Sequence, residues 1–313
     1  MSHHSYAIEI KPVGVSAALI HAISRQQMSP RSEVNSDVHA GSPYPQSVTI
    51  NAQKTEATAT TMDIANALDL IGVEGAALED PGIRFWQIER DPLTGMAKTT
   101  DVHRSAQMKR GKVVPMRLSC EHQGDASLEL KALGTKDPST DDSAANLPIV
   151  FADSLALPTG LGGDERYTLH EGTIGGTTVD CLTSVSLDFG IGIATEGCNS
   201  NVWDGSIVVN QIKPILTFTG RNIALLSTIG LVGTTGAHAN TGFTLRRRSQ
   251  VAAGFTALTG TEHIRFTINP LAHWETITDS SNNNSNTNTL QLVGRHDGTN
   301  TPLIVQTGVA LSV

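Results

Sequence analysis

Apolar and polar residues alternate along much of this chain, and alternation with a period of two predicts β-strands. The clearest run covers residues 184–193, where every second position is apolar: Val185, Leu187, Phe189, Ile191 and Ile193. Small or polar residues fill the positions between them, among them Ser184, Ser186 and Asp188. We therefore expect one long strand, with an apolar face against a core and a polar face turned away from it.

Two further alternating runs predict a hairpin. Residues 114–120 and 126–132 alternate on either side of a polar turn at 122–125, where Gly124 eases the reversal of the chain. More strands are expected at 6–10, 47–51, 83–89, 207–212, 215–219, 263–268, 289–293 and 303–311. Pro214 lies between two of them and predicts an edge position or a bend.

Helical spacing is rare in this sequence. Residues 62–71 carry apolar residues at helical intervals, with Thr61 as a candidate N-cap and Gly72 as the stop. Residues 222–229 predict a shorter helix, and residues 16–27 a third. Such a small helical content predicts an all-β fold, a β-sandwich or barrel with one or two short helices.

Four predicted connections are long: 28–46, 134–146, 157–165 and 280–289. Loops longer than roughly a dozen residues are usually functional or disordered. On a β-rich protein without a catalytic site, the functional interpretation is contact with a neighbouring subunit. The alternative is that these loops are simply flexible.

The order strand, helix and glycine-closed turn occurs twice. It first covers residues 47–75, ending in Leu-Ile-Gly-Val-Glu-Gly, and then residues 215–233, ending in Thr-Ile-Gly-Leu-Val-Gly. Identity between the two segments is low, so both chance and duplication explain it. A duplicated chain would divide in the loop 157–165 into two β-rich halves, residues 1–160 and residues 161–313.

Composition narrows the function classes. Charged residues make up 17% and aromatic residues 4% of the 313 residues. Because few large aromatic side chains are available for the core, the chain would gain stability by burying further surface against copies of itself. The net charge of −8 offers no basic field to nucleic acid. No apolar run approaches the roughly 20 residues that cross a bilayer, and the N-terminus has no signal pattern. We therefore expect a soluble protein without membrane contact.

The three cysteines, Cys120, Cys181 and Cys198, are few and odd in number. That count favours reduced thiols in a cytosolic product over a disulfide framework.

Sequence motifs for catalysis are missing. The chain has no GxSxG, GxxxxGK[ST], HExxH or CxxC pattern. Asp164 and Glu165 directly follow the glycine-rich loop 160–163, and their charges would repel a phosphate. We expect no catalytic residue, no cofactor and no metal ligand, and therefore no enzyme.

Two rival functions stay open beside a structural one. A β-rich hydrolase would have to gather residues such as His170, Glu171, Asp188 and His273 in one pocket. A carbohydrate-binding, decoration or fibre module is the other, and sugar binding would expose two of the three tryptophans on one face. These are Trp86, Trp203 and Trp274.

Arg246, Arg247 and Arg248 form the one basic run, on a strand expected from residue 243. Alternation turns Arg247 to one face and its neighbours to the other. Inter-subunit salt bridges or a solvated strand edge are the favoured interpretations, because no aromatic platform for nucleic acid accompanies the run.

A set of short motifs lies mainly within residues 166–311. They are the segment 167–170, Thr173-Ile174-Gly175-Gly176, the strand 181–193, Trp203-Asp204-Gly205, Ile212-Lys213-Pro214-Ile215 and the closing run 290–311. In this order they resemble the tail tube (major tail) proteins of long-tailed bacteriophages, in which a short Ile-x-Gly turn precedes a long strand. Residues 47–133 fit that family more loosely.

The resemblance implies a structural virion protein whose rings stack into a hollow tail tube. Double-stranded DNA passes through that tube without specific binding. A single-domain chain would form hexameric rings, and a duplicated chain trimeric rings with pseudo-sixfold symmetry. The length of this chain favours either duplication or an added domain.

The same resemblance implies the partners and the location. The partners are further copies of the chain, a tape measure protein, and tail terminator or baseplate proteins. The chain would be assembled in the host bacterial cytoplasm and end in the virion tail. An acidic lining would keep DNA from adhering, so Ser184, Ser186 and Asp188 are candidates for the lumen face. The alternative for Asp188 is plain exposure to solvent.

Overall fold

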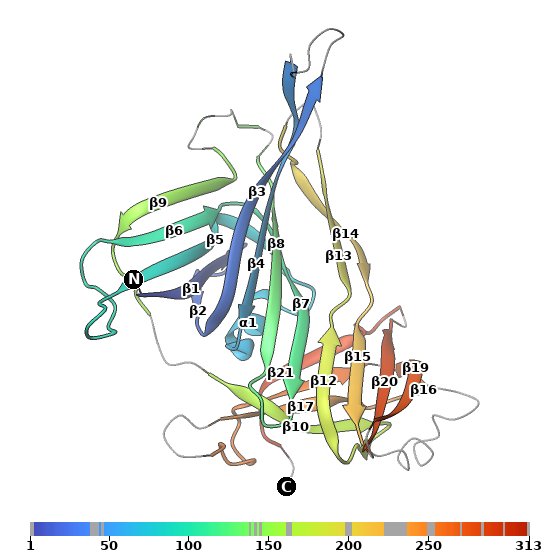
Figure 1. Ribbon diagram of the computed structural model, residues 1–313. Helices are drawn as coiled ribbons and strands as arrows, with labels where there is room; N and C mark the ends of the chain where they lie inside the picture. The colour runs from blue at the N-terminus through green and yellow to red at the C-terminus, as the bar shows by residue number, and fades with distance from the viewer. Residues whose placement is uncertain are drawn as a thin grey trace.

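The computed structural model describes residues 3–37, 44, 47–137, 139–140, 143, 146–160, 165–197, 202–221, 237–248, 254–269, 271–282, 285–296 and 298–311. Strands dominate these residues, and all pairings between named strands are antiparallel (Figure 1). The predicted all-β sandwich class is thereby confirmed.

The elements fall into two series along the chain. The first contains β1 (His3–Pro12), β2 (Ala18–Ile20), β3 (Ile23–Asp37), β4 (Ser47–Thr61), α1 (Ile64–Ile71), β5 (Ala76–Arg90), β6 (His103–Met108), β7 (Gly111–Glu121), β8 (Ser127–Gly134) and β9 (Ile149–Leu155). The second contains β10 (Tyr167–Ile174), β11 (Thr177–Thr178), β12 (Leu182–Asp188), β13 (Ile191–Glu196), β14 (Ser206–Ile212), β15 (Ile215–Gly220), β16 (Ala237–His238), β17 (Thr241–Arg247), β18 (His263–Ile268), β19 (Leu271–Asn282), β20 (Ser285–Arg295) and β21 (Leu303–Val309).

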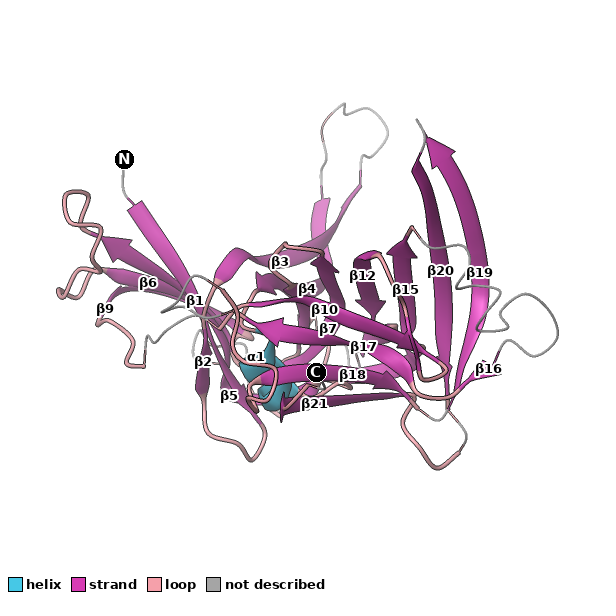
Figure 2. Cartoon of the chain, turned by 90° about the horizontal axis from the view of Figure 1, so that it is seen from below, coloured by secondary structure: helices cyan, strands magenta, loops and turns pink. Residues whose placement is uncertain are grey.

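Eight strands form one continuous antiparallel layer, which we call the inner sheet. Their order across the layer is β3, β4, β8, β7, β12, β15, β20 and β19. Two further layers of five strands each, which we call the outer layers, complete the fold. They are β2-β1-β5-β6-β9 and β11-β10-β17-β18-β21. In Figure 2 the layer with β10, β17, β18 and β21 faces the inner sheet, whereas the layer with β1, β6 and β9 extends sideways beyond β3.

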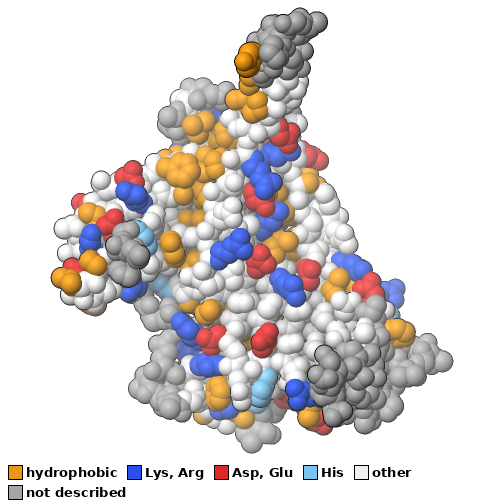
Figure 3. All heavy atoms as spheres, viewed as in Figure 1, with side chains coloured by type: hydrophobic (Ala, Val, Ile, Leu, Met, Phe, Trp, Pro, Cys, Tyr) orange, Lys and Arg blue, Asp and Glu red, His pale blue; other side chains and the backbone are white. Residues whose placement is uncertain are grey.

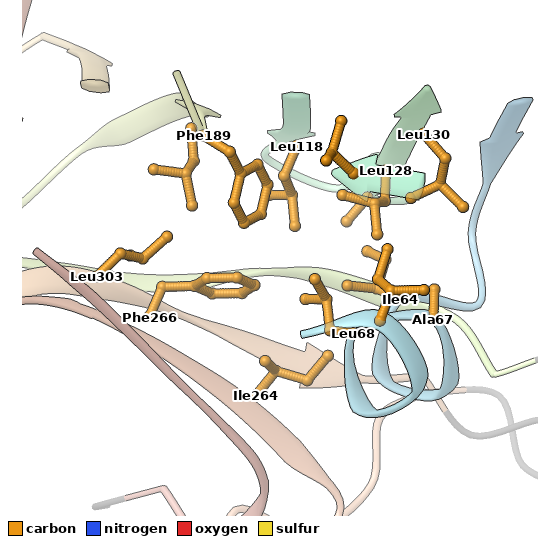
Figure 4. Close-up of a cluster of buried hydrophobic side chains, with 14 of the residues drawn as sticks. Ile64, Ala67, Leu68, Leu118, Leu128, Leu130, Phe189, Ile264, Phe266 and Leu303 are labelled. Carbon is orange, nitrogen blue, oxygen red and sulfur yellow. The ribbon is translucent and has the colours of Figure 1, made fainter. Parts of the chain in front are cut away.

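The core lies between the inner sheet and these outer layers, with α1 in the same space. Figure 4 shows Leu118, Leu128 and Phe189 of the inner-sheet side facing Phe266 of β18 and Leu68 of α1. All five side chains are buried, and the ring of Phe266 stacks on Phe243 with centroids 4.6 Å apart. The apolar positions of the alternating runs therefore build one shared core.

The strand pairing of the first series recurs in the second. The pairs β1–β2, β1–β5, β5–β6, β6–β9, β5–β7, β7–β8, β4–β8 and β3–β4 have the counterparts β10–β11, β10–β17, β17–β18, β18–β21, β16–β19, β19–β20, β15–β20 and β12–β15. In this correspondence β16 and β17 together match the single strand β5. Each half thus contributes a four-stranded unit to the inner sheet, β3-β4-β8-β7 or β12-β15-β20-β19. The pairing of β7 with β12 joins the two units.

Irregularities of the backbone in the first half recur at equivalent positions in the second half, with a constant offset in residue number. Ala22 and Cys181 both have positive φ, at 51° and 55°. A register shift follows each of them, between Ile23 and Arg25 in the first half and between Leu182 and Ser184 in the second. A second pair of shifts falls at 115/117 in β7 and 274/276 in β19. The halves therefore share a fold in detail, although their sequences differ.

Buried histidines close equivalent hairpins in the two halves. The Nδ1 atom of His103 accepts the Glu89 N–H at 3.1 Å, and its Nε2 lies 3.0 Å from the Lys98 carbonyl oxygen. His263 accepts the Arg247 N–H at 3.1 Å and contacts the Ala257 carbonyl oxygen at 2.9 Å. Both rings are fully buried, and an Nδ1 that accepts an N–H beside an Nε2 that faces a carbonyl oxygen fits the tautomer protonated on Nε2.

The helix predicted at 62–71 is confirmed as α1, which begins two residues later. Its N-cap is Asp63 and not Thr61. The Thr61 hydroxyl instead donates to the His21 carbonyl oxygen at 2.7 Å and accepts the Asp63 N–H at 3.0 Å. Gly72 ends the helix as predicted, with φ 68° and its N–H 2.8 Å from the Leu68 carbonyl oxygen. The helix predicted at 222–229 lies outside the described residues.

The helix predicted at 16–27 was wrong. This segment forms β2 and the start of β3, with a reversal at Ala22. Ile20 of β2 is fully buried and lies opposite Ile8 of β1, so sheet pairing outweighs the local helical spacing.

Two of the four predicted loops were also wrong. Residues 28–37 continue β3, so all described residues of 28–46 except residue 44 are strand. Residues 280–289 lie largely in the hairpin of β19 and β20. The connections 134–146 and 157–165 hold no strand between residues 135 and 146 or 157 and 165, as far as those residues are described.

The long strand predicted over 184–193 is broken at Gly190. β12 ends at Asp188, and β13 leaves the inner sheet to pair with β14. Gly190 has φ 62°, and a Cβ atom there would lie 1.8 Å from the Lys213 carbonyl oxygen. Pro214 separates β14 from β15 at the same level, which confirms the predicted bend. The other expected strands fall within observed strands, except that the runs expected at 126–132 and 303–311 extend one residue before β8 and two residues past β21.

Candidate assembly surface

The side of the inner sheet that faces away from the core is its polar face. Two rows of residues cross it from strand to strand. One row consists of Ser127, Ser119, Ser186, Thr217 and Gln291, and the other of Glu121, Ser184, Thr219 and Thr289. Hydroxyl, amide and carboxylate groups on this face suit contact with water, and the opposite face packs against the core.

The predicted orientation of β12 is confirmed. Val185 and Leu187 are buried in the core, whereas Ser184, Ser186 and Asp188 point to the polar face. The two serines are half-buried by their neighbours, and Asp188 is exposed. A carboxylate oxygen of Asp188 accepts the Gly190 N–H at 2.8 Å, so this side chain also braces the bend between β12 and β13.

Carboxylates outnumber cations in the middle of the polar face. Glu121, Glu129 and Asp188 are exposed there, and Arg117 lies directly opposite Asp188. Lys131 is paired with Glu56 of β4, with nitrogen and oxygen 2.9 Å apart. The centre of this surface is therefore polar and mildly acidic.

Both lateral edges of the inner sheet carry backbone groups without a strand partner. Along its whole length β3 pairs with β4 and with no second described strand. β19 pairs with β20, and on its other side only Ala272 and His273 pair with a described strand, β16. Long exposed strand edges invite pairing with another chain.

The junction between the halves consists of the β7–β12 pairing and an arginine cluster beside it. Asp125, at the hairpin end of β7 and β8, forms ion pairs with Arg166 and Arg248, each at 3.0 Å. Arg248 also donates to the Gln123 carbonyl oxygen. These contacts tie the first half to β10 and β17 of the second.

The three consecutive arginines point to alternate faces, as predicted. Arg246 and Arg248 lie over the ring of Phe255, at 5.0 and 5.9 Å from its centroid. Arg247 turns the other way and pairs with Glu165 at 2.9 Å and Glu262 at 3.2 Å. All three are thus engaged within the chain, and their contact with other subunits stays a prediction.

Two two-stranded arms extend from the inner sheet at the same end (Figure 1). One is the outer part of β3 and β4, with Val34, Val48 and Ile50 at least 48% exposed, and the other is β13 with β14. The arms touch where the Gln53 N–H donates to the Val202 carbonyl oxygen at 2.6 Å.

An apolar groove lies beside β3, between it and the outer strands β5, β6 and β9. Met28, Phe85, Ala106 and Ala152 line it together with Phe151, which is 65% exposed. Figure 3 shows hydrophobic side chains gathered on this flank of the molecule. Sequence reasoning missed the groove, because β9 was not predicted as a strand.

The residues that a hydrolase would have needed are not gathered. His170 and Glu171 lie on β10, where Glu171 accepts the Thr178 hydroxyl at 2.6 Å. Asp188 is on the polar face, and His273 is on β19 beside β16. Burial lowers the pKa of His170, and nearby Arg246 and His263 lower it further against the opposing effect of Glu171.

The tryptophans do not form an exposed platform for sugars. Trp86 and Trp203 are buried, and Trp86 donates its indole N–H to Glu9 at 3.2 Å. Trp274 is half-buried in β19.

Within the described part of the chain, no group of three or more His, Cys, Asp and Glu side chains is placed to hold a metal ion. The described helix, α1, is too short to span a membrane. Neither a protein-family model nor a curated protein matches the chain.

Proposed function

We propose that this chain is a structural virion protein, the subunit of a hollow phage tail tube that conducts double-stranded DNA. One observation carries the proposal: the inner sheet has one polar face, and its edge strands β3 and β19 have no outer partner among the described strands, apart from the short pairing of β19 with β16. Such a sheet can continue into copies of itself, and only closure into a barrel leaves no exposed edge. The resemblance of residues 166–311 to tail tube proteins supports the same function.

The repeat within the chain sets the proposed symmetry. Each copy supplies two four-stranded units, so a trimeric ring holds six units in pseudo-sixfold symmetry, the arrangement that we favour over a hexamer. Strands lie about 4.8 Å apart, so three eight-stranded sheets would give a barrel roughly 37 Å across its backbone, before any widening by strand tilt. Barrels of 16–18 strands already enclose a water-filled channel, and this barrel would be wider.

The polar face would line that channel. Its hydroxyl groups and the carboxylates at its centre, Glu121, Glu129 and Asp188, match the requirement that DNA should slide past without binding, because phosphates are repelled by carboxylates and attracted by lysine and arginine. Ser184, Ser186 and Asp188 are the lumen residues that we propose. The outer layers would then form the outside of the tube, and the arms would lie at one end of each ring.

In this proposal the chain is made in the host bacterial cytoplasm and resides in the virion tail. Its partners are copies of itself within and between rings, a tape measure protein inside the tube, and terminator or baseplate proteins at the tube ends. It needs no cofactor, and it makes no membrane contact.

Electron microscopy of the purified chain tests this function. We expect rings with a central hole at micromolar concentration and stacked tubes at higher concentration, with light scattering reporting the mass of the ring. A stable monomer that forms neither rings nor tubes over a wide range of concentration and salt would refute the proposal.

A further inference from the structure

We propose that β19 of one copy pairs antiparallel with β3 of the next copy, in the register that β7 and β12 adopt within the chain. This inference deepens the proposed function, because it names the two surfaces that meet when a ring forms. The partner is a second copy of this chain, in a head-to-tail contact.

The recurring strand pairing carries the argument. β19 is the counterpart of β7, since each is the strand that pairs with the last inner strand of its half, β20 or β8. β3 is likewise the counterpart of β12. β7 and β12 pair at the junction, whereas their counterparts β19 and β3 carry the two edges without partners among the described strands.

Strand direction is compatible with this contact. Neighbouring strands of the inner sheet alternate in direction through all seven pairings from β3 to β19. The sheet has an even number of strands, so β3 of a second copy in the same orientation runs antiparallel to β19. The alternation therefore continues from copy to copy without interruption.

The shared register shifts fix the alignment. At the junction Ser184–Asp188, just after the shift in β12, lie opposite Glu121–Arg117, just after the shift in β7. The equivalent positions are 25–29 in β3 and 276–280 in β19. Gln27 of one copy would then lie opposite Thr278 of the next, as Ser186 lies opposite Ser119.

Pro30 marks the end of this pairing. In the second half the Phe189 N–H donates across the junction to the Met116 carbonyl oxygen at 3.0 Å. Pro30 is the counterpart of Phe189 and has no N–H, so the new ladder stops at Ser29. Proline within a sheet is normally confined to an edge, with its nitrogen on the unpaired side. Here that side is the one on which the next copy would begin.

The exposed apolar residue Phe151 belongs to the same interface. Phe151 is the counterpart of Val305 in the second half. Phe151 pairs with Ala106 of β6, and Val305 pairs with Phe266 at the equivalent position of β18. Val305 is half-buried and lines a groove with Leu68 and Val73, at the end of α1. Phe151 has no such cover within its own copy and is 65% exposed. The next copy would cover it when the edges pair.

Arg90 is the counterpart of Arg248, and this equivalence supports the same interface. It forms an isolated bridge with Ala97, as Arg248 does with Phe255. Arg248 reaches across the junction to Asp125 at the hairpin end of β7 and β8. Arg90 is exposed, and in a ring it would lie near the hairpin end of β19 and β20 of the neighbouring copy.

A disulfide across the interface tests the register directly. We would substitute Gln27→Cys and Thr278→Cys in a chain that also carries Cys181→Ser and Cys198→Ser. The N–H groups that point across the junction are those of Phe189 and of every second residue before it, which excludes Ser186. Ser186 and Ser119 therefore form a pair without backbone hydrogen bonds to each other. Such pairs bring Cα atoms to about 4.5 Å, within the range that a disulfide spans.

On oxidation we expect most of the monomer band to convert into covalent multimers, up to a closed ring, on a non-reducing gel. Each single variant should stay largely monomeric. A pair with Gln27→Cys and Thr289→Cys, which places the second thiol on the same face but one strand further in, should also stay monomeric.

The outcomes separate this inference from the proposed function. Rings or tubes that form without the predicted cross-link would overturn the register and leave the tail tube standing. Cross-linked rings that never stack into tubes would support the interface and count against the tail tube. A chain that stays monomeric and uncross-linked would overturn both.

Discussion

At the scale of single residues, hydrogen bonds to the backbone explain the buried histidines, whose role could not be predicted from their spacing along the sequence. His263 is not among the residues for which the sequence predicts a role. The structure gives it two main-chain partners, the Arg247 N–H and the Ala257 carbonyl oxygen. His103 repeats the arrangement. These rings satisfy buried backbone groups, which would otherwise cost stability.

Cysteine reactivity is the first prediction at this scale. Cys120 lies at the junction, opposite Val185, and burial raises the pKa of its thiol to about 12. Cys181 is exposed in the turn before β12. Because the thiolate is the reactive form, iodoacetamide at pH 8 should modify Cys181 and spare Cys120 in the folded protein.

Mass spectrometry of tryptic peptides measures this difference, with Cys198→Ser in the background to simplify the count. In denaturant both thiols should react at similar rates, which serves as the control. Equal modification of both cysteines under native conditions would contradict a closed junction.

At the scale of elements, alternation predicted strands well where one face meets the core. Residues 114–132 and 184–188 were identified because Leu118, Leu128 and Leu187 are buried and their neighbours are not. Alternation fails where both faces are exposed. Residues 30–36 of β3 are all exposed, so the arm has no apolar period and was interpreted as a loop.

The candidate surface was predicted only in part for the same reason. Ser184, Ser186 and Asp188 could be assigned to a polar face from the sequence, since their neighbours had to be buried. The unpaired edges and the exposed Phe151 could not be predicted, because they depend on which strands pair. The break at Gly190 was also missed, because its glycine was taken for one more small residue on the polar face.

The bend at Gly190 supports the second prediction. Gly190→Ala should lower the free energy of unfolding by about 2–4 kcal/mol, because its φ of 62° is strained for alanine and the added Cβ meets the Lys213 carbonyl oxygen. Gly192→Ala is the matched control two residues away. Its Cβ would have no heavy atom nearer than 3.6 Å, and it has no positive φ.

Chemical denaturation followed by circular dichroism measures both variants below the concentration at which rings form. If both alanine variants unfold at the wild-type midpoint, the strand does not need a sharp turn at Gly190. In that case β12 and β13 would behave as the single strand that alternation predicted.

At the scale of the whole molecule, two open edges and one polar face have the same consequence. A sheet that ends in unpaired strands on both sides is either protected by its own chain or completed by another. In this chain the junction between the halves already shows how such an edge is completed, by β7 and β12 with the Asp125 ion pairs beside them. The ring that we propose would extend the same contact around a closed path, so that each half would meet its neighbours in the same way.

The charge of the polar face provides the last prediction. In a tube, every copy contributes its polar face to one channel, so Glu121→Lys together with Glu129→Lys should turn a mildly acidic lining into a basic one. Both side chains are exposed, so the variant should still assemble. Its tubes should retain short duplex DNA on sedimentation at low salt and release it as salt is raised, because phosphate binding by lysine is salt-dependent. Wild-type tubes should retain none.

The control variant, Asp101→Lys with Glu74→Lys, makes the same change in charge at exposed positions away from the polar face and should retain far less DNA. If this control retains as much DNA as the polar-face variant, the polar face does not line the channel.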